Sequence, residues 1–283
     1  MRSATLGTLL LLSCHACSTN DSKSQTEEQG SAKGGQTADD ENLGGQGAGS
    51  AEQGDDTDDT APPRKALCPP DPDWTACEAT DFSVEEIIDN EKWKISTWGS
   101  ANRTHSVDNL SVIDGALELK VNGGTVPGET TTGAEITSAR NDYLYGSFRM
   151  IAQGSAEPGT VFGWFYYLSD KSEIDIELLS KFDSAQTVHF TIHENIGAST
   201  HQAKDVGFSP SSGFHEYRFD WLKDRVNYYV DGELLVTLKE NVPFEPGAIL
   251  LNHWTLSSTA WGGGPPAKDA IAKVRSIEIY TNL

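Results

Sequence analysis

The segment Ser172–Leu179 constrains the fold of this 283-residue chain more than any other. Its sequence is Ser-Glu-Ile-Asp-Ile-Glu-Leu-Leu, in which Glu173, Asp175 and Glu177 alternate with two isoleucines. Alternate residues of a β-strand point to opposite faces of the sheet, so the three acids share one face and the isoleucines share the other. Three neighbouring carboxylates repel one another, and this is costly unless the protein uses them.

Two alternatives compete with a functional role for these acids. Such a triplet also occurs on a solvated strand face, and clustered carboxylates can bind a cation. The flanking sequence argues for a central strand, because the apolar and aromatic run 161–168 precedes the acids and reaches them through the short turn 169–172. A pair of carboxyls on such a strand suits acid–base chemistry on a sugar.

The first residues of the chain have the pattern of an export signal. Arg2 is followed by an apolar run over residues 4–12, which is shorter than the roughly 20 residues that a membrane span needs. The run ends in Leu11-Leu-Ser-Cys14, which resembles a bacterial lipobox. We expect residues 1–17 to be a lipoprotein-type signal peptide with Cys14 acylated; a plain cleaved signal is the alternative. The protein would be exported, either as a cell-surface or periplasmic lipoprotein that touches the membrane only through its lipid anchor, or in secreted form.

Residues 18–65 are predicted to form a linker. From Ser18 to Ala61 the only large apolar residue is Leu43, and 11 acids against two lysines give a net charge of −9. Such a segment buries too little apolar surface to offset the entropy of ordering, so we expect a flexible acidic tether rich in Gly, Ser and Gln. An acidic interaction tail is the alternative.

Residues 66–283 are long enough to form one folded domain with a substantial core. The net charge of the whole chain is −21, which excludes nucleic acid as a partner but does not penalise a neutral polysaccharide. We expect a monomer. Because an exported protein meets oxidising conditions, Cys68 and Cys77 are predicted to form a disulfide.

The domain is predicted to be all-β. Segments with alternating polarity recur with turn residues between them, while helical periodicity is scarce. This pattern indicates a β-sandwich, a jelly roll of two antiparallel sheets with a concave substrate cleft. The predicted strands are 110–114, 116–121, 145–152, 187–193, 215–221, 225–230, 233–238, 248–254 and 274–280, in addition to 161–168 and the acidic strand.

With these strands in place, the chain resembles glycoside hydrolase family 16, the family of licheninases, laminarinases and related transglycosylases. The residues Glu173-Ile-Asp-Ile-Glu177 match its signature in the form without an inserted residue, although Ser172 stands where licheninases usually have Asp. Further matches, at the expected spacing, are Tyr145-Gly-Ser-Phe-Arg-Met150, Gly213-Phe-His-Glu-Tyr-Arg-Phe-Asp-Trp221, Tyr229-Val-Asp-Gly232 and Asn252-His-Trp254.

The resemblance implies a role for each acid of the triplet. Glu173 corresponds to the nucleophile, Glu177 to the general acid/base, and Asp175 to the residue that tunes them. Residues i and i+4 of a strand have Cα atoms about 13 Å apart. Retaining hydrolysis needs carboxyl groups about 5–5.5 Å apart, so retention is implied by the resemblance and not by the spacing.

The resemblance also points to substrate-binding residues. Glu135, Asn252 and Trp254 map onto positions that contact the glucan in licheninases. The loop 261–266, Trp-Gly-Gly-Gly-Pro-Pro, follows the last of these strands, and we place it on the cleft rim, where it sets substrate choice or simply ends the strand.

Other candidates for sugar binding come from the residue pattern itself. Trp164 and Tyr166 share one face of the strand before the acidic one, and sugar rings stack on aromatic faces. Core packing is the alternative for every aromatic residue, and it is the preferred interpretation for Trp93 and Trp221. His193 is a candidate hydrogen-bond partner of the sugar, with a solvated histidine as the alternative.

We expect no cofactor. Many members of the family hold calcium on the convex side through an Asp of the last strand, but here that position is Arg275, which makes calcium doubtful. The resemblance implies a retaining endo-β-glucanase that cleaves β-1,3-1,4- or β-1,3-glucan. The alternatives are a transglycosylase of the same fold, of the xyloglucan or chitin–glucan type, and a non-catalytic surface glycan-binding protein.

Overall fold

The computed structural model describes residues 66–84, 91–100, 102–126, 128–193, 199–257, 259 and 261–282. The predicted signal peptide 1–17 with Cys14, and the predicted linker 18–65, lie outside the described residues. Residues 67–283 belong to one compact unit. Within the described part of the chain, no helix has the length and apolar character needed to cross a membrane.

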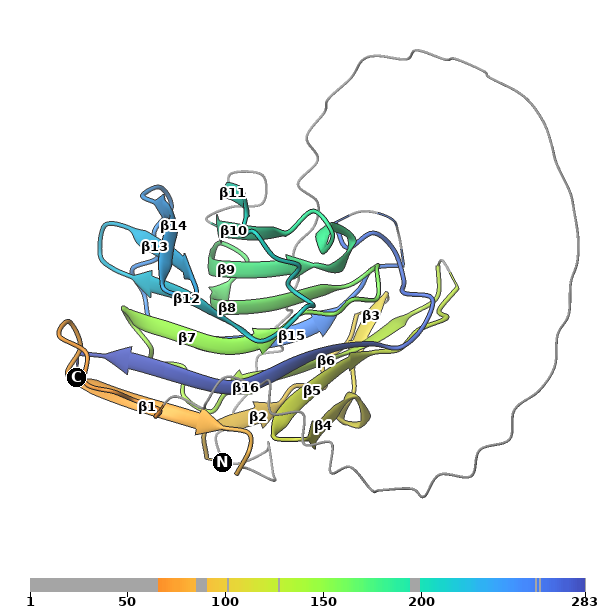
Figure 1. Cartoon of the computed structure of the whole chain (residues 1–283), viewed down its shortest axis with the longest axis horizontal. Helices are drawn as coiled ribbons and strands as arrows, with labels where there is room; N and C mark the ends of the chain where they lie inside the picture. Colours follow the sequence, from red (N-terminus) through yellow and green to blue (C-terminus); the bar gives the residue numbers. More distant parts are fainter. Residues whose placement is uncertain are drawn as a thin grey trace, which may run out of the picture. The chain divides into compact units, whose positions relative to one another are not determined.

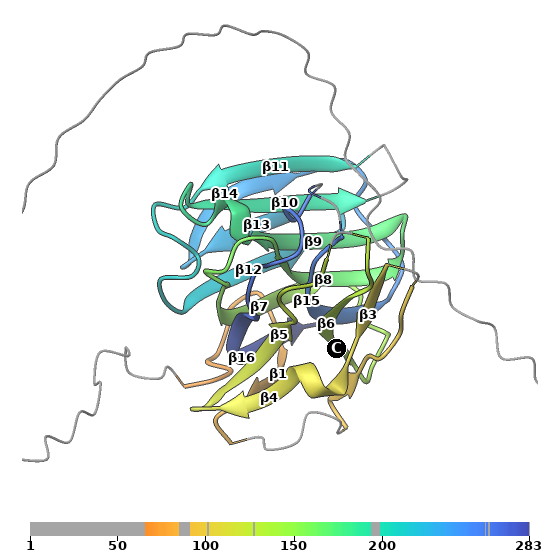
Figure 2. The same ribbon diagram turned by 90° about the vertical axis from the view of Figure 1, so that its right-hand side faces the viewer.

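Two β-sheets stack face to face to form this unit (Figures 1 and 2). The strands of the first sheet run in the order β14-β13-β12-β7-β16-β5-β4, and β1 joins the sheet by pairing with β16. These strands are β1 (Ala76–Asp81), β4 (Leu110–Ile113), β5 (Ala116–Val121), β7 (Gly146–Gln153), β12 (His215–Trp221), β13 (Val226–Val230), β14 (Glu233–Leu238) and β16 (Ala270–Thr281).

The second sheet has the order β11-β10-β9-β8-β15-β6-β2, and β3 joins it by pairing with β6. Its strands are β2 (Trp93–Ile95), β3 (Arg103–His105), β6 (Thr131–Ser138), β8 (Val161–Ser169), β9 (Ser172–Leu179), β10 (Thr187–His193), β11 (Thr200–Asp205) and β15 (Ala248–Trp254). The described residues also form two short 3-10 turns, Val107–Asn109 and Ser180–Phe182. The β3–β6 pair is parallel and the other ladders are antiparallel, which confirms the predicted all-β sandwich.

The core lies between the sheets and follows from the alternation along each strand. Alternate residues of β12, among them Phe219 and Trp221, point inward and meet aromatic residues of β8. Phe219 lies 6.1 Å from Trp164 between ring centroids, and Trp221 lies 4.3 Å from Tyr166. Trp93 of β2 is also buried in this core, so the predicted packing role of Trp93 and Trp221 agrees with the structure.

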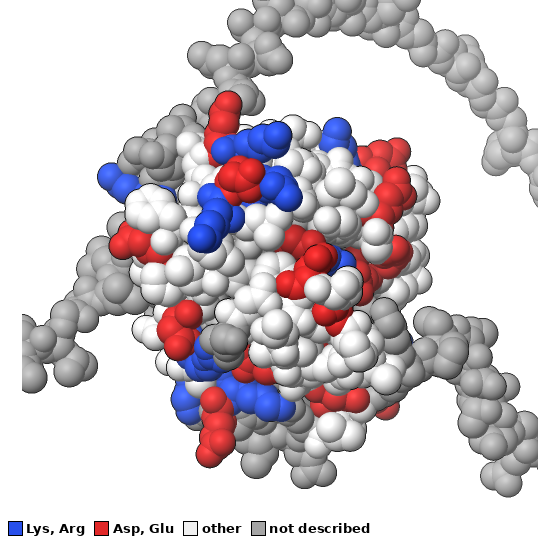
Figure 3. All heavy atoms as spheres, turned by 90° about the vertical axis from the view of Figure 1, so that its left-hand side faces the viewer, with Lys and Arg blue, Asp and Glu red and all other residues white. Residues whose placement is uncertain are grey.

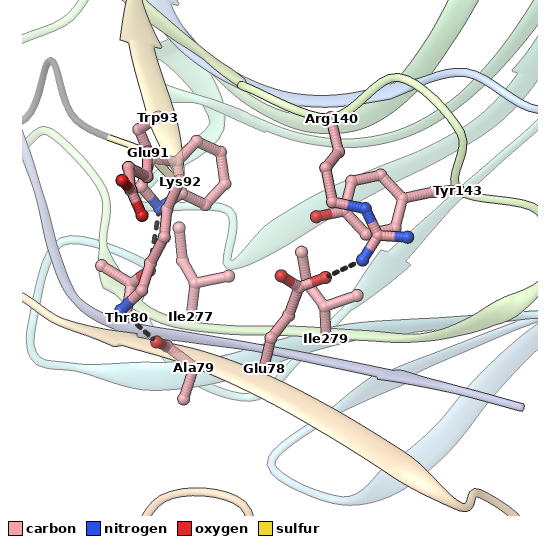
Figure 4. A pocket seen from close by; sticks show the side chains of 10 residues that line it. All are labelled: Glu78, Ala79, Thr80, Glu91, Lys92, Trp93, Arg140, Tyr143, Ile277 and Ile279. Carbon is pink, nitrogen blue, oxygen red and sulfur yellow. Dashed lines mark hydrogen bonds and ion pairs between the residues drawn. The ribbon is translucent and has the colours of Figure 1, made fainter. Parts of the chain in front are cut away.

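The edge of the sandwich beside β1 is closed by polar and ionic contacts (Figure 4). The guanidinium of Arg140 pairs with Glu78 at 3.2 Å, and the Lys92 ammonium donates to the carbonyl of Ala79 at 2.9 Å. These side chains line a cavity of about 50 Å³, well below the roughly 300–1,000 Å³ that is usual for small-molecule sites. We therefore assign this cavity to the packing of the sandwich edge.

Cys68 and Cys77 form a disulfide, as predicted. Cys77 lies on β1, and the bond ties the segment before β1 to the first sheet. The backbone N–H of Cys68 also donates to the carboxylate of Glu278 on β16. The segment that follows Cys68 is therefore held against the outer face of the first sheet.

Candidate active site

The three acids of β9 lie on the face of the second sheet that points away from the core. Ile174 and Ile176, which alternate with them, are buried in the core, as the sequence predicts. The pairing register with β8 and β10 places partners of each acid on the same face. Glu177 lies opposite Gly163 and His189, Asp175 opposite Phe165 and Thr191, and Glu173 opposite Tyr167 and His193.

All three carboxyls are buried although they lie on the outer face of the sheet. Glu173 and Asp175 are each 4% exposed and Glu177 is 7% exposed. Burial disfavours the charged form, so it raises the pKa of all three acids, and the repulsion between neighbouring carboxylates raises the pKa of Glu173 and Asp175 further. The three groups therefore do not all ionise together at neutral pH.

Among the three acids, Glu177 has the largest number of neighbours that stabilise its ionised form. Burial raises its pKa to about 7, while His193, the indole of Trp261 and the guanidinium of Arg103 act in the opposite direction. The indole N–H of Trp261 donates a hydrogen bond of 3.0 Å to Glu177 Oε2. Glu177 can therefore lose and regain a proton near neutral pH.

Glu173 and Asp175 have a different environment. They share a side-chain hydrogen bond, which raises the pKa of Glu173 and lowers that of Asp175. Asp175 Oδ2 also lies 3.3 Å from Nε2 of His193, whose Nδ1 lies 2.6 Å from the hydroxyl of Ser199. One carboxyl of this pair can hold a proton while the other carries the charge, which is the condition for an anionic nucleophile.

A second polar group lies two strands away on the same face. Asn252 of β15 is paired with Glu135 of β6, and the Asn252 amide donates to Glu135 Oε2 at 3.2 Å. The indole of Trp98 donates to Glu135 Oε1 at 2.7 Å. Gly163 of β8 separates this group from Glu177, and a Cβ there would lie 2.8 Å from Asn252 Oδ1. The glycine therefore leaves room between the two polar groups.

Trp254 also lies on this face, at the end of β15. Trp254 is 4% exposed, because it packs in a cluster with Val161 and Leu179, and the guanidinium of Arg103 lies 4.5 Å from the centre of its ring. Arg103 also lies 5.1 Å from the ring of Trp98. Burial raises the pKa of both Glu135 and Glu177, and the charge of Arg103 acts in the opposite direction on both. The sequence gives no signal for Arg103, because a lone arginine on a three-residue strand forms no motif.

The prediction that Trp164 and Tyr166 bind substrate is wrong. Both side chains are fully buried between the sheets, because they alternate with the residues of β8 that lie beside the acids. Phe165 and Tyr167 occupy the outer face instead, opposite Asp175 and Glu173. The pairing register between β8 and β9 explains this, because Trp164 pairs with Ile176 and Tyr166 with Ile174, and both isoleucines point into the core.

The loop that begins at Trp261 reaches Glu177 through the indole hydrogen bond. Trp261 packs edge-on against His189, with 4.9 Å between ring centroids, and against His201, with 5.7 Å. Nδ1 of His189 lies 3.1 Å from Nε2 of His201 on β11. These rings form an aromatic wall beside Glu177.

Two clusters among the described residues bring three potential metal-ligating atoms within 4.8 Å of one another. In one of them, Cys68 and Cys77 are bonded to each other and are joined by Glu278. The other consists of Glu173, Asp175 and His193, in which the two carboxyls share a hydrogen bond and Asp175 lies 3.3 Å from His193. For calcium, the position suggested by the resemblance holds Arg275, whose guanidinium lies 3.9 Å from the ring of Phe214. An arginine offers no oxygen ligand, so this position does not fit calcium, and we derive no step through a metal.

Fold and site together define a class of protein. Two buried acids of one strand have unlike protonation environments, and hydrogen-bonding and aromatic side chains surround them on the same sheet face. This arrangement is that of a glycosidase with paired carboxyls.

Residues 97–274 match the family described as glycosyl hydrolases family 16, and the chain belongs to this family. It is 30% identical over 194 residues to a β-glucanase of Paenibacillus polymyxa, with 61% of this chain and 79% of that protein covered. A β-glucanase of Paenibacillus macerans is 32% identical over 194 residues, with 61% and 80% covered.

Solved structures show the same fold. A β-1,3-1,4-glucanase (lichenase) derived from a mouse hindgut metagenome is 25% identical and aligns with a TM-score of 0.63, over 74% of this chain and 100% of its own. The laminarinase catalytic domain of Thermotoga maritima, at 21% identity, aligns with a TM-score of 0.64 over 74% and 99%. The latter likeness concerns the fold alone.

Proposed function

We propose that this protein is an endo-β-glucanase that hydrolyses β-1,3-1,4- or β-1,3-glucan with retention, through a covalent glycosyl-enzyme. The main support is the difference in environment between the two outer acids of β9. Glu177 has its pKa raised to about 7 and accepts a hydrogen bond from Trp261, whereas Glu173 shares a hydrogen bond with Asp175. The names of the relatives, which are β-glucanases, favour this substrate class.

In the first step Glu177 acts as the general acid. Its proton passes to the glycosidic oxygen while the Glu173 carboxylate attacks the anomeric carbon, the bond to the leaving sugar breaks, and an ester forms between Glu173 and the glycosyl group. Glu173 attacks as an anion, so the proton that it shares with Asp175 has to lie on Asp175 at that moment. We assign Asp175 the role of holding that proton.

In the second step the ionised Glu177 acts as the general base. It takes a proton from a water molecule whose oxygen attacks the anomeric carbon, and the ester to Glu173 breaks. The product keeps the β configuration, and both carboxyls return to their starting protonation states. Arg103 and Trp261 lower the pKa of Glu177 and so favour its ionised form in this step.

We assign sugar binding to the polar group beside the acids. Glu135 and Asn252 offer oxygen and amide groups to sugar hydroxyls, while Trp98, Trp254 and Arg103 bound the same region. Phe165 and Tyr167 replace Trp164 and Tyr166 as the aromatic candidates on β8. His193, whose ring nitrogens face Asp175 and Ser199, is proposed to orient Asp175 rather than to act on the sugar directly.

Azide rescue tests the two glutamate roles. The Glu173→Ala enzyme lacks the nucleophile, so azide should attack an activated β-glycoside directly and give an α-glycosyl azide. The Glu177→Ala enzyme still forms the ester when the leaving group needs no protonation, and azide should resolve the ester to a β-glycosyl azide. NMR distinguishes the two anomers. If Glu173→Ala gives the β-glycosyl azide and Glu177→Ala the α-glycosyl azide, the roles of the two glutamates are the reverse of those proposed. Full activity of both variants would refute the enzyme proposal.

A polysaccharide panel tests the substrate class. Lichenan, laminarin, xyloglucan, chitin derivatives, agarose and carrageenan are incubated with the enzyme, and new reducing ends are counted. We expect release from lichenan or laminarin. Products longer than the donor would instead identify a transglycosylase, and binding without cleavage a glycan-binding protein.

We also propose that the protein is exported and acts as a monomer held at the membrane by acylated Cys14. The disulfide between Cys68 and Cys77 supports an oxidising compartment. Cys14→Ala should release the protein from the membrane fraction without changing its activity in detergent extracts. Unchanged partition of this variant would contradict the anchor.

A further inference from the structure

A cavity of about 570 Å³ lies on the first sheet, outside the residues assigned to catalysis. Its volume falls within the range of about 300–1,000 Å³ that is usual for small-molecule sites. The cavity is lined at one end of the sheet by residues of β12 and β13, the turn between these strands, the residues before β7, and the last residues of the chain. Figure 3 views the molecule from the side on which this end of the first sheet lies.

The floor of the cavity is the outward face of β12 and β13. Val226, Tyr228 and Val230 of β13 point into the core, whereas Asn227 and Tyr229 alternate with them and point outward. Asp220 lies opposite Asn227 in the register between the two strands.

Ion pairing and hydrogen bonding fix the floor residues in place. Asp220 accepts two hydrogen bonds from the guanidinium of Arg218, of 2.7 and 2.5 Å, and this guanidinium also lies 4.4 Å from the centre of the Tyr229 ring. Tyr229 also shares a hydrogen bond with Asp220. A carboxylate has about four lone-pair positions, so Asp220, which lines the cavity, can accept one more hydrogen bond there.

One wall of the cavity is the segment before β1. Asp71 pairs with Arg149 of β7 at 2.6 Å, and Asp71 forms a bridge with Trp74. The side-chain amide of Asn282 donates to the carbonyl of Asp73 at 3.0 Å. These contacts hold Asp73 and Trp74 over the outward face of the sheet, so the wall is part of the folded structure.

The cavity combines aromatic rings with hydrogen-bonding groups. Trp74, Tyr145 and Tyr229 line it and are all partly exposed. Tyr145 has a φ angle of 60°, a conformation that is uncommon for a bulky side chain and that tends to persist where the surrounding structure or a function requires it. Its ring packs edge-on against Trp221, 5.2 Å between centroids.

The charges around the cavity balance. Asp73 and Asp220 contribute two negative charges, and Lys223 and Arg225 contribute two positive charges. Figure 3 shows basic and acidic side chains in separate mixed groups with uncharged surface between them, not a field of one sign. A phosphate or an acidic polymer would gain little net attraction here, whereas a neutral polyhydroxylated ligand meets rings and hydrogen-bonding groups without a charge penalty.

We propose that this cavity is a second, non-catalytic binding site for a neutral oligosaccharide stretch of the glucan substrate. The sugar faces would pack on Trp74, Tyr145 and Tyr229, and the hydroxyls would bond to Asp220, Asn227 and Asn282. The identity of the ligand rests on the proposed glucanase function. One polymer chain that engages both sites would bind more tightly than either site alone allows.

The test measures polymer affinity in the full chain with Glu177→Gln, which prevents digestion. Native gels that contain lichenan or laminarin report affinity as retardation. Trp74→Ala and Tyr229→Ala should each weaken binding about tenfold. Phe244→Ala removes an aromatic side chain that is 74% exposed and outside the cavity, so this control should bind like its parent. In the active enzyme, the same cavity variants should hydrolyse a short chromogenic oligosaccharide at the parent rate.

The outcomes separate this proposal from the glucanase function. If both cavity variants bind polymer like Phe244→Ala, the second site is refuted, whatever the enzyme hydrolyses. If the active enzyme cleaves none of the glucans but the cavity variants still lose retardation, the glycan site stands and the glucanase function fails. Asn227→Ala, which removes a polar contact without a large volume change, repeats the test if an aromatic substitution lowers the melting temperature.

Discussion

We expect the hydrogen bond from Trp261 to Glu177 to make the pH profile of the enzyme depend on a loop distant in sequence from β9. Trp261→Phe keeps an aromatic ring and removes the N–H that donates to Glu177 Oε2 at 3.0 Å. A hydrogen bond to a charged acceptor contributes about 1.5–3 kcal/mol. Because Trp261 is only partly buried, the lower end of this range applies, and about 1.4 kcal/mol corresponds to one pKa unit.

The sign of the change follows from the form that the indole stabilises. Trp261 favours the ionised Glu177, so its loss should raise the Glu177 pKa above the present value of about 7, by roughly one unit. The general acid has to be protonated, so activity falls as the pH rises through this pKa. The basic limb of kcat/KM against pH should therefore move about one unit upward.

The assay follows reducing-end release from lichenan or laminarin between pH 4 and 10. Trp98→Phe is the matched control, because it removes an indole bond of 2.7 Å to Glu135 and leaves Glu177 untouched. This control should lower affinity for the polymer without moving the basic limb. A limb that stays in place or moves downward in Trp261→Phe would refute the assignment of Glu177 as the acid.

Two further predictions concern Arg103 and the disulfide. Arg103→Met should lower kcat/KM about tenfold or more and raise the pKa of Glu177, because it removes a charge that favours the ionised acid. Arg103→Lys should keep the pKa of Glu177 but lose the planar contact with Trp98 and Trp254. Equal activity of the two variants would contradict this prediction. Replacing both Cys68 and Cys77 by serine should destabilise the domain by about 2–3 kcal/mol and lower its melting temperature by roughly 5–10 °C, measured by thermal unfolding; an unchanged transition would show that the loop is constrained by other contacts.

The sequence predicted most of the sheet architecture because the strands are amphipathic and bounded by turn residues. The predicted strands 116–121, 187–193 and 248–254 match β5, β10 and β15 residue for residue. Short or polar strands were missed. β3 has three residues and β11 is mostly exposed, so neither has an alternation from which to predict a strand.

The site was predictable where function depends on alternation along one strand, and not where it depends on register between strands. The acids of β9 could be assigned to one face from the sequence, but the face of Trp164 depends on which residue of β8 pairs with which acid. Arg103 acts on Glu177 through its charge from 74 residues away in sequence, and Trp261 donates a hydrogen bond to it from 84 residues away. No sequence pattern near either residue predicts its interaction with Glu177.

The buried acids also make stability depend on pH, in a direction opposite to that of a salt-bridged carboxylate. An acid whose pKa is raised on folding binds more protons in the native state than in the unfolded state. Its contribution to stability is therefore present at low pH and is lost as the pH rises from the unfolded value near 4.5 to the folded value. For Glu177, with a folded pKa of about 7, the loss is complete somewhat above pH 7 and is on the order of 3 kcal/mol.

Glu177→Gln removes this ionisable group and keeps the shape of the side chain. The variant should therefore gain melting temperature over the parent at pH 8 and gain little at pH 5, where the parent acid is already protonated in the folded state. Asp224→Asn, at a carboxylate that is 71% exposed, should show no such difference between the two pH values. If the gain of Glu177→Gln is equal at pH 5 and pH 8, its origin is packing and not the buried charge. A gain confined to high pH would show that the buried Glu177 is kept at the expense of stability, as expected if it is selected for proton transfer.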